Sequence, residues 1–521
     1  MTNMKMLRGL LALTLAASFT IVAAQSCGTS CAVLGCDFYE KGCPCQCSKC
    51  VKHNDCCSDW DAACDGGHGS AAGPDAGPEQ HHLSLTASPS EMVVSFATSN
   101  KPSYQATPIC TLVAPDGSNV TFSGASHTYT TNVSSPWQGL LHTVRFTGLT
   151  PSQRYKYTCR VGSSEGAQHS FLAAPPVGYL PVTVAVVGDM GEGCNMDDHG
   201  RDGCANATIA RLQADVAKAS EETSASAEAN NGTAPFSLLV HVGDIAYTGG
   251  VETVYDGFLN ELEPVAASVP YQVCVGNHEH YFNFSGFLAR FAMSESSQVM
   301  SSQVMSSQFD PNRMSASAQL RLPATPAAPA APAADPLVVN NLFYSFDYGG
   351  VHFVAYSTEH DLAPQLNFIS ADLAAVNRTR TPWVVAFAHR PVYCSTNDHN
   401  DCDIGGPKFG QQLEPLFSQF KVDLALFGHL HNYERTWPVY QGQVSARSYA
   451  NPSATVHAVV GMAGDIEGLT DDFSPTVPSW SAVRDSRLGY ARLHFVSATR
   501  MSLYYTLASN GSVADEFTIT K

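Results

Sequence analysis

The sequence predicts an α/β domain over residues 180–521, preceded by an all-β domain over 81–176 and a small disulfide-rich module over 27–64. Three observations support this organisation. Long apolar runs with helical stretches between them fill the last region, short β-type runs separated by turns fill the middle one, and ten cysteines are concentrated in the first. A chain of 521 residues is also too long for one hydrophobic core.

Residues 1–24 have the order of a secretory signal peptide, because Lys5 and Arg8 precede an apolar run over 10–24 that ends in Ala23 and Ala24. The run is shorter than the roughly 20 residues that a membrane span needs, and no second long apolar segment follows. We therefore expect export and no membrane span. The expected location is secreted or extracellular, with the vacuole or the lysosome as alternatives.

The segment 27–64 is too short for an adequate hydrophobic core, so we expect disulfides to replace one, with zinc binding as the alternative. Its ten cysteines are Cys27, Cys31, Cys36, Cys43, Cys45, Cys47, Cys50, Cys56, Cys57 and Cys64. The runs Cys45-Gln-Cys47 and Asp55-Cys56-Cys57-Ser-Asp-Trp60 resemble the somatomedin B domain, although Cys36 and Cys43 are additional. This resemblance implies a module that binds an extracellular protein partner. A Gly/Pro/Ala-rich linker follows over 65–80.

Residues 81–176 contain short β-type runs, such as Met92–Phe96 and Tyr155–Cys159, that are separated by turn signals. This pattern predicts a β-sandwich, within which we expect Cys110 and Cys159 to pair. In an exported chain, N-glycosylation sequons are expected at exposed positions. Seven sequons begin at Asn119, Asn132, Asn206, Asn231, Asn283, Asn377 and Asn510.

The overall charge is strongly acidic, with 28 basic and 46 acidic residues and a net charge of −18. Binding to nucleic-acid backbones needs clustered Lys and Arg, so we expect no nucleic-acid binding. An anionic substrate stays compatible with this charge, because a bound metal ion outweighs the global field within its own site.

In residues 180–521, each of five apolar runs ends at polar residues of metal-binding type. Strands buried on both faces are continuous apolar runs, and α/β folds bind ligands beyond the carboxyl ends of their strands. Glycine precedes four of the polar residues, and we expect it to let the chain turn sharply there. The runs 181–187, 236–242, 269–275, 383–388 and 422–427 end at Gly188-Asp189-Met-Gly191, Gly243-Asp244-Ile-Ala-Tyr247, Gly276-Asn277-His278-Glu279, His389 and Gly428-His429-Leu-His431. Helical stretches are expected at 207–218 and 365–376.

These blocks resemble the purple acid phosphatases of the metallophosphoesterase superfamily, whose five motifs are GDxG, GDxxY, GNHE, VxxH and GHxH in this order. Four are intact here, and the fourth has Ala386 in place of the usual valine. The run from His142 to Pro151 matches the family's N-terminal domain, so the resemblance covers 83–521 apart from one insertion. It implies a catalytic four-layer α/β/β/α sandwich, preceded by a fibronectin-type-III-like domain, with the site between two sheets.

The resemblance also implies two metal ions and their ligands. Asp189, Asp244, Tyr247 and His431 form a hard, anionic set suited to Fe(III). Asn277, His389 and His429, with Asp244 as the bridge, suit a divalent ion such as Zn, Fe(II) or Mn. Such a pair of cations clamps the attacking and leaving oxygens of a displacement at phosphorus and acidifies a bound water. The implied function is a secreted acid phosphatase that hydrolyses phosphate monoesters by metal-bound hydroxide.

Two further histidines are catalytic candidates. His278 matches the family histidine that binds phosphate and donates a proton, with orientation of the turn as the structural alternative. His399 follows His389 by ten residues, where plant members carry a histidine that assists the leaving group, but its surroundings resemble versions in which that position varies. We expect Cys394 to pair with Cys402 and Cys194 with Cys204, and we expect Cys274 to be a buried thiol.

A low-complexity insertion over 293–336 is expected to be a surface excursion, with a lid over the site as the alternative. Two other functions remain open. The same metal set would serve a nucleotide pyrophosphatase or phosphodiesterase, and the chain could instead be an extracellular binding protein with a vestigial phosphatase domain. The sequence does not predict the oligomeric state.

Overall fold

The computed structural model describes residues 77–129, 131, 137–192, 205–221, 235–293, 341–464 and 467–521, all of which lie within the unit 71–521. The predicted signal peptide, the cysteine-rich module and most of the linker lie outside the described residues. So do Cys194, Cys204 and the predicted insertion beyond Met293. Met293 itself is buried, so the core includes the first residue of that insertion.

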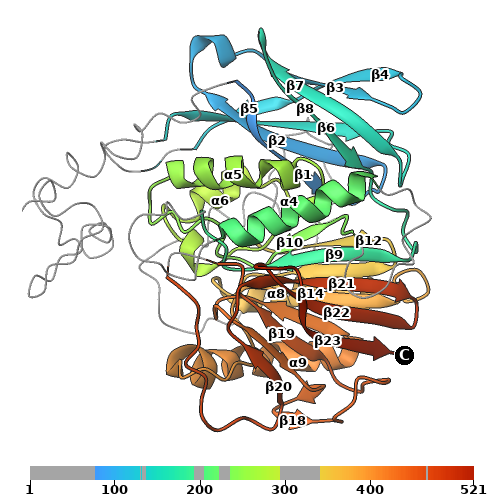
Figure 1. Cartoon of the computed structure of the whole chain (residues 1–521), viewed down its shortest axis with the longest axis vertical. Coiled ribbons are helices and arrows are strands. Elements are labelled where there is room, and N and C mark those ends of the chain that lie inside the picture. Colours follow the sequence, from blue (N-terminus) through green and yellow to red (C-terminus); the bar gives the residue numbers. More distant parts are fainter. Residues whose placement is uncertain are drawn as a thin grey trace, which may run out of the picture. The chain divides into compact units, whose positions relative to one another are not determined.

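An antiparallel β-sandwich forms the N-terminal part of the described chain (Figure 1). Its sheets have the orders β1-β2-β6-β5 and β4-β3-β7-β8. Burial alternates along β7, as expected where one face of a strand packs on a core and the other meets solvent. Cys110 and Cys159 lie opposite each other on β3 and β7 and form the predicted disulfide. The strands are β1 Glu79–Leu85, β2 Glu91–Ser99, β3 Pro108–Val113, β4 Asn119–Ser123, β5 Ala125–His127, β6 Gly139–Thr147, β7 Arg154–Val161 and β8 Ser164–Leu172.

Two mixed sheets form the framework of residues 182–520. The six-stranded sheet has the order β11-β10-β9-β21-β22-β23, and the seven-stranded sheet has the order β12-β13-β14-β15-β19-β16-β20. In the first, the strands are β9 Val182–Val187, β10 Leu239–His241, β11 Tyr271–Val273, β21 Gly489–Ser497, β22 Arg500–Leu507 and β23 Val513–Thr520. In the second, they are β12 Tyr344–Tyr348, β13 Val351–Ala355, β14 Trp383–Phe387, β15 Leu424–Phe427, β16 Tyr433–Thr436, β19 Val456–Val460 and β20 Ser481–Asp485.

The position of strand β14 between two hydrophobic clusters explains why its sequence is apolar throughout. Trp383, Val385 and Phe387 join the hydrophobic cluster that includes the six-stranded sheet. Val384 and Ala386 join a second cluster that includes residues of α8 and α9. Because successive side chains of a strand point to opposite faces, a strand covered on both sides has no polar face.

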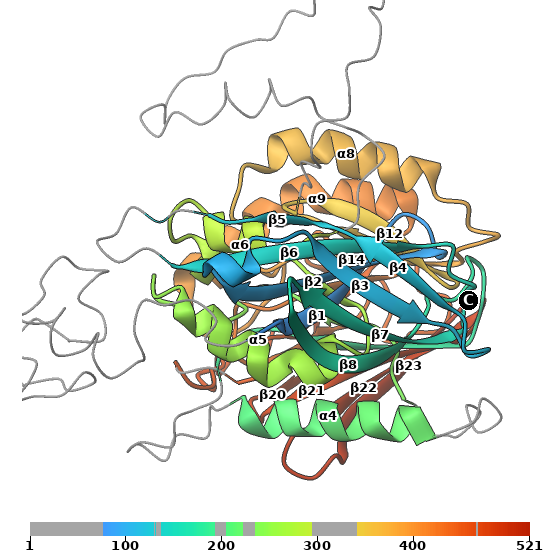
Figure 2. The same ribbon diagram turned by 90° about the horizontal axis from the view of Figure 1, so that it is seen from above.

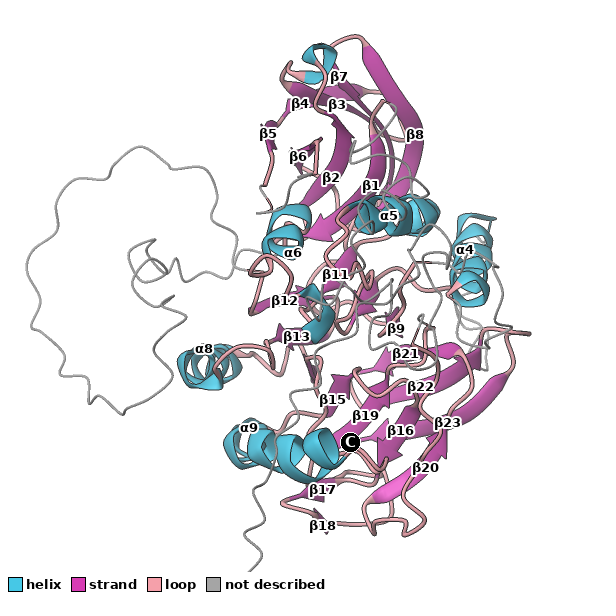
Figure 3. Ribbon diagram, turned by 90° about the vertical axis from the view of Figure 1, so that its left-hand side faces the viewer, coloured by secondary structure: helices cyan, strands magenta, loops and turns pink. Residues whose placement is uncertain are grey.

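The main helices lie on the outer sides of the two sheets (Figures 2 and 3). Helices α8 (Leu362–Ala375) and α9 (Gly406–Phe420) cover the seven-stranded sheet, and α4 (Asn206–Glu221) lies at the opposite side with α5 (Thr253–Ala266). The two predicted helical stretches correspond to α4 and α8. None of the helices in the described ranges is long and apolar enough to cross a membrane.

The β-sandwich packs against α5 through buried polar contacts as well as apolar ones. Tyr129 donates a hydrogen bond to Glu252 at 2.6 Å, and the Trp137 indole donates to Asp256 at 2.8 Å. Arg290, at the end of α6 (Ser285–Arg290), is buried and forms an ion pair with Asp256 at 2.9 Å. These paired groups fix where the sandwich meets the α/β part of the chain.

Candidate metal centre

The predicted motifs meet because parallel strands end at a common edge. Strand β10 pairs in parallel with β9 and β11, so Asp189, Asp244 and Asn277, which follow these strands, lie together. Strands β14 and β15 also pair in parallel, and His389 and His429 follow them. The backbone N–H of His429 donates to both carboxylate oxygens of Asp189, at 3.0 and 2.8 Å, and so joins the ends of the two sheets.

Four of the predicted ligands have a left-handed backbone. The φ angles are 57° for Asp189, 52° for Asp244, 53° for Tyr247 and 71° for His429. For residues other than glycine this conformation costs on the order of 1 kcal/mol each, and it persists only where the surrounding structure enforces it. Such strain is concentrated at functional sites, and here it turns each side chain toward one centre.

The glycines before these residues have a different role from the one that the sequence suggested. Only Gly243 has a left-handed φ, of 88°. At the other three positions, atoms from other parts of the chain approach too closely for a side chain. An added Cβ would lie 2.2 Å from Oδ1 of Asp244 at Gly276, and 2.4 Å from Oδ2 of Asp189 at Gly428. Close approach, rather than backbone freedom, therefore requires glycine there.

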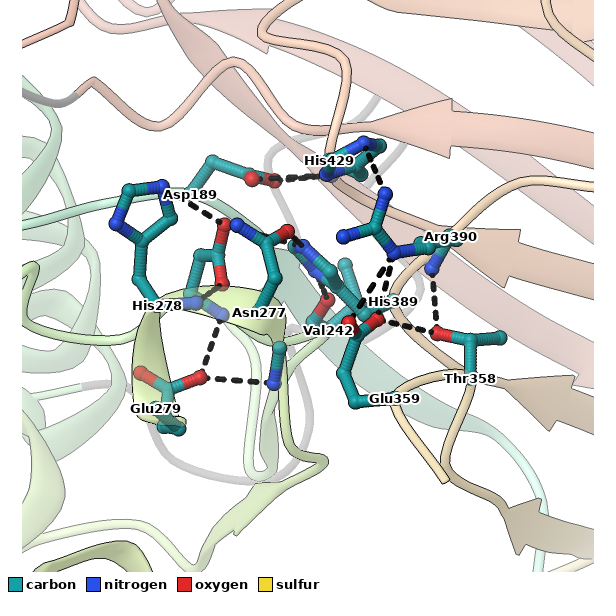
Figure 4. Close-up of polar contacts among 12 residues, drawn as sticks. Asp189, Val242, Asn277, His278, Glu279, Thr358, Glu359, His389, Arg390 and His429 are labelled. Carbon is teal, nitrogen blue, oxygen red and sulfur yellow. Dashed lines mark hydrogen bonds and ion pairs between the residues drawn. The ribbon is translucent and has the colours of Figure 1, made fainter. Parts of the chain in front are cut away.

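His389 lies at the centre of the predicted divalent half of the site (Figure 4). Its Nε2 is 3.0 Å from Oδ2 of Asp244 and 3.0 Å from Oδ1 of Asn277. Its Nδ1 is 3.0 Å from the carbonyl oxygen of Val242, which accepts a hydrogen bond if Nδ1 carries the proton. That partner leaves the Nε2 lone pair free to bind a metal. The ligand atoms of Asp244, His389 and His429 all lie within 4.8 Å of one another.

The predicted iron half is built on Tyr247. Its hydroxyl oxygen lies 3.3 Å from Oδ1 of Asp189 and 3.1 Å from Nε2 of His431. Nδ1 of His431 is 2.7 Å from the carbonyl oxygen of Gly468, so Nε2 is again the nitrogen left for a ligand. Two oxygens and one nitrogen therefore converge from three different loops.

His429 is oriented by charged neighbours outside the motifs. Its Nε2 lies 2.8 Å from Oδ2 of Asp401 and 2.9 Å from Nη1 of Arg390. Arginine can only donate a hydrogen bond, so the two neighbours favour opposite tautomers of the imidazole. Asp401 favours a proton on Nε2, which leaves Nδ1 free as a ligand. Arg390 itself forms ion pairs with Asp401 at 2.6 Å and with Glu359 at 3.0 Å. Figure 4 shows the contact with Glu359.

The charge of the site favours cations. Asp189 is fully buried and Asp244 is 1% exposed. Burial alone would lower the pKa of His389, but the carboxylates of Asp244 and Asp189 raise it to about 10. The same imidazole, against the effect of burial, holds the pKa of Asp244 well below its usual range. The site therefore binds a proton strongly, and a metal ion would replace that proton.

Glu279 supports the loop that carries Asp244. Its carboxylate accepts hydrogen bonds from the backbone N–H groups of Asp244, Ile245 and Gly276, at 3.0, 2.9 and 2.8 Å. Burial and the nearby charge of Asp244 raise the pKa of Glu279 to about 7. The side chain thus holds two of the ligand-bearing loops together rather than facing the centre.

His278 faces the same centre from the next position in the chain. Its ring packs on Tyr247 with centroids 4.3 Å apart, and its Nε2 lies 3.9 Å from Oδ2 of Asp244. The carboxylate of Glu467 is 3.6 Å away. Burial lowers the pKa of His278, but Glu467 and Asp244 raise it by a larger amount. The imidazole is therefore placed to carry a proton beside the ligands.

A cavity of about 600 Å³ opens over these residues. The π-helical segment His399–Gly405 forms part of its wall, although the side chain of His399 lies outside the described part of the structure. Its lining is strongly acidic: Asp244, Asn277, His278, Asn397, Asp398, Asn400, Asp401, His429, Leu430, His431, Glu467, Thr470 and Asp472.

The structure brings together all seven residues that the sequence predicted as ligands, and it places His278, a predicted catalytic residue, beside them. The predicted disulfide between Cys394 and Cys402 is present in the loop that lines the cavity, and Cys274 is a buried free thiol. Sequence reasoning missed the charged groups around His429. Arg390 directly follows His389, but Glu359 lies in a loop and Asp401 in the π-helical segment, and neither belongs to one of the five motifs.

Three family models match successive parts of the chain. The purple acid phosphatase N-terminal domain matches residues 78–172, the calcineurin-like phosphoesterase matches 182–433, and the iron/zinc purple acid phosphatase-like protein C matches 454–516. Together they cover the β-sandwich, most of the two sheets and every residue of the candidate centre.

Individual proteins are similar along most of the chain. Acid phosphatase type 7 of Homo sapiens is 30% identical over 500 residues, which are 88% of this chain and 94% of that protein. The Arabidopsis thaliana protein named probable inactive purple acid phosphatase 1 is 30% identical over 398 residues, 74% of this chain and 58% of its own. The structure of the purple acid phosphatase PPD1 from yellow lupin (Lupinus luteus) seeds superposes with a TM-score of 0.66 at 23% identity, covering 85% and 74% of the two chains.

Proposed function

The chain belongs to the purple acid phosphatase family, and we propose that it hydrolyses phosphate monoesters at a binuclear centre of Fe(III) and a divalent metal. The observation that supports this most directly is the convergence of carboxylate, phenol, amide and imidazole donors from five strand ends. Similarity to this family does not by itself establish activity, because some relatives are named as probable inactive purple acid phosphatases. The donor set of this chain is complete, which supports an active enzyme over an extracellular binding protein with a vestigial phosphatase domain.

The residues present fit the two metals. Tyr247, Asp189 and His431, with Asp244 shared, would hold the trivalent ion, because they supply hard and anionic donors. Asn277, His389 and His429 would hold a divalent ion such as Zn, Fe(II) or Mn. When bound, two such cations neutralise the phosphate oxygens and acidify a water molecule.

The chain's own groups would position the substrate and move a proton. His278 lies beside the ligands, and its raised pKa favours the protonated form, so we assign it to phosphate binding and to protonation of the leaving oxygen. Asp401 and Arg390 would orient His429. No leaving-group role is assigned to His399.

The acidic wall of the cavity favours monoesters over nucleotides. Asp398, Glu467 and Asp472 line it beside the ligands. A nucleotide or a diphosphate would bring several negative charges past these carboxylates, which repel them at short range. A monoester brings one phosphate group, which the metals neutralise. We therefore favour the monoesterase over a nucleotide pyrophosphatase. A simple phosphodiester carries a single negative charge, so the assay on the diester decides between the monoesterase and a phosphodiesterase.

We also propose that the protein is secreted and glycosylated. The order of residues 1–24 supports export, and two disulfides in the described chain suit an oxidising compartment. All five sequon asparagines in the described ranges are exposed: Asn119, Asn206, Asn283, Asn377 and Asn510. Residues 27–64 would then bind a protein outside the cell.

The test combines metal analysis with three substrates. The purified enzyme is assayed at acidic pH on p-nitrophenyl phosphate, bis(p-nitrophenyl) phosphate and ATP. Its iron, zinc and manganese are counted per chain, with ferrous iron counted separately. We expect two metal ions in the centre and the highest kcat/KM for the first substrate. Higher kcat/KM for ATP or the diester would reject the monoesterase, and absence of all three activities with both metals bound would reject the enzyme.

A further inference from the structure

A second group of metal-binding side chains lies where the β-sandwich meets α5. His81 belongs to β1, His169 to β8 and Glu263 to α5, so the three come from both sandwich sheets and from the α/β part of the chain. Figure 1 shows β1 directly beside α5. Their ligand atoms all lie within 4.8 Å of one another. The group shares no residue with the candidate metal centre described above.

The three side chains point at one oxygen. Nδ1 of His81 lies 2.7 Å from Oε1 of Glu263, and Nε2 of His169 lies 3.2 Å from the same atom. The other carboxylate oxygen, Oε2, accepts a hydrogen bond from the backbone N–H of Gln80 at 3.1 Å. This bond fixes the carboxylate, so that Oε1 faces the two imidazoles. Backbone support of this kind is typical of residues that hold metals.

Hydrogen bonding within the group is incomplete. Nε2 of His169 is buried, and despite its distance of 3.2 Å from Oε1 it has no aligned hydrogen-bond partner among the described residues. Buried polar atoms are nearly always satisfied, so an unpartnered nitrogen needs an explanation. A metal ion placed between this nitrogen and Oε1 would use the lone pair that no donor approaches.

The donor set suits a borderline divalent cation. Two imidazoles and one carboxylate form a common protein ligand set for Zn²⁺, with a water molecule as the fourth ligand. Bond lengths of about 2.0–2.1 Å in a tetrahedron place ligand atoms about 3.3 Å apart. The 3.2 Å between His169 and Glu263 matches this spacing, and the 2.7 Å between His81 and Glu263 would widen when an ion replaced the proton between them. The His81 ring is fully buried, whereas His169 is 13% and Glu263 is 18% exposed, so an ion would enter from the side of the latter two.

The protonation states of His81 and Glu263 suit metal binding. Burial lowers the pKa of His81, which keeps the imidazole neutral as a ligand must be. Burial would raise the pKa of Glu263, but the two neighbouring imidazoles hold it well below its usual range. The imidazoles therefore favour the ionised carboxylate, the form that binds a metal.

We propose that His81, His169 and Glu263 bind a third divalent metal ion, zinc or a similar cation, that ties the β-sandwich to α5. This ion takes no part in the chemistry of the cavity. It is a structural cross-link, and it stabilises the arrangement of the sandwich and the α/β part through bonds to both.

The experiment counts zinc in the holoenzyme after equilibration with excess zinc and removal of free metal. The wild type is compared with His169→Asn and with Glu263→Gln, which keeps the shape of the carboxylate. The matched control is His127→Asn, because His127 is an exposed histidine of the same sandwich whose Nε2 lies 2.8 Å from the carbonyl oxygen of Ala289, away from the cluster. We expect the wild type and the control to hold one equivalent of zinc per chain more than either cluster variant.

Turnover and thermal unfolding complete the test. We expect equal kcat in all four proteins, and a rise in Tm on addition of zinc in the wild type and the control only. Equal zinc content in the wild type and His169→Asn would overturn the proposal, because the extra metal would then lie elsewhere. A wild-type protein that holds no zinc beyond its catalytic metals would overturn it without any variant. Loss of phosphatase activity in every protein would reject the proposed function, and the zinc count would stand independently.

Discussion

Substitution of Asp401 by Asn tests how the divalent half of the centre is oriented. The carboxylate accepts a hydrogen bond from Nε2 of His429 at 2.8 Å and forms an ion pair with Nη1 of Arg390 at 2.6 Å. An amide keeps the shape but loses the charge that favours a proton on Nε2. Arg390, 2.9 Å from the same nitrogen, would then donate to it and move the imidazole proton to Nδ1, the atom that should bind the metal.

The expected effect is a loss of divalent-metal affinity of about 10- to 100-fold, the usual cost of removing a carboxylate that orients a metal-binding histidine. This corresponds to about 1.4–2.7 kcal/mol. The dissociation constant of the divalent ion is measured by competition with a chelator, and iron content serves as the internal reference. We expect kcat at saturating divalent metal to recover much of the wild-type value.

Asp398→Asn is the matched control for this prediction. Asp398 lines the same cavity and loses the same charge, but its carboxylate accepts from the backbone N–H groups of Asn400 and Asp401 instead of from His429. We expect its divalent-metal affinity to stay within about threefold of the wild type, because no ligand is oriented by it. An equal loss in both variants, or no loss in Asp401→Asn, would refute the orienting role of Asp401.

Three further predictions concern other residues. His389→Ala should abolish activity and lower the divalent metal to well below one per chain, because its Nε2 is the only ligand from its strand end; near-normal turnover at full metal occupancy would contradict the site. Tyr247→Phe should keep the far-UV circular dichroism but remove the visible absorption of an Fe(III) phenolate; a colourless wild type with both metals bound would show that no such bond exists. His352 is held between Asp347 and Asp372 at 2.8 Å each, and although burial lowers its pKa, these carboxylates raise it to about 9. Its contribution to stability should be complete below pH about 6.5 and lost as the pH rises through about 9, by up to about 3 kcal/mol. Denaturant unfolding of wild type and His352→Gln at both ends of this range measures it, and an equal pH dependence in the two proteins would disprove the assignment.

The amino-acid sequence by itself determined the elements and the chemical type of the site. Apolar runs that end in Asp189, Asp244 and His389 indicated strands buried on both faces, because only such strands lack a polar side. The structure has β9, β10 and β14 at these places, with residues of β14 alternating between two hydrophobic clusters. The two disulfides in the described chain, Cys110–Cys159 and Cys394–Cys402, were also predictable from the positions of these cysteines in the sequence.

The tertiary structure decided everything that depends on contacts between distant loops. The glycine of the GNHE block is needed because the Asp244 loop approaches it, and the sequence gives no measure of that distance. Glu359, after β13, and Asp401, in the π-helical segment after β14, flank Arg390 only because the ends of these two strands lie side by side. His81, His169 and Glu263 are up to 182 positions apart in the chain, as the hydrogen bond between His81 and Glu263 records. Local patterns encode periodicity and turns, whereas such groups arise from how the sandwich and the sheets pack, which no local pattern contains.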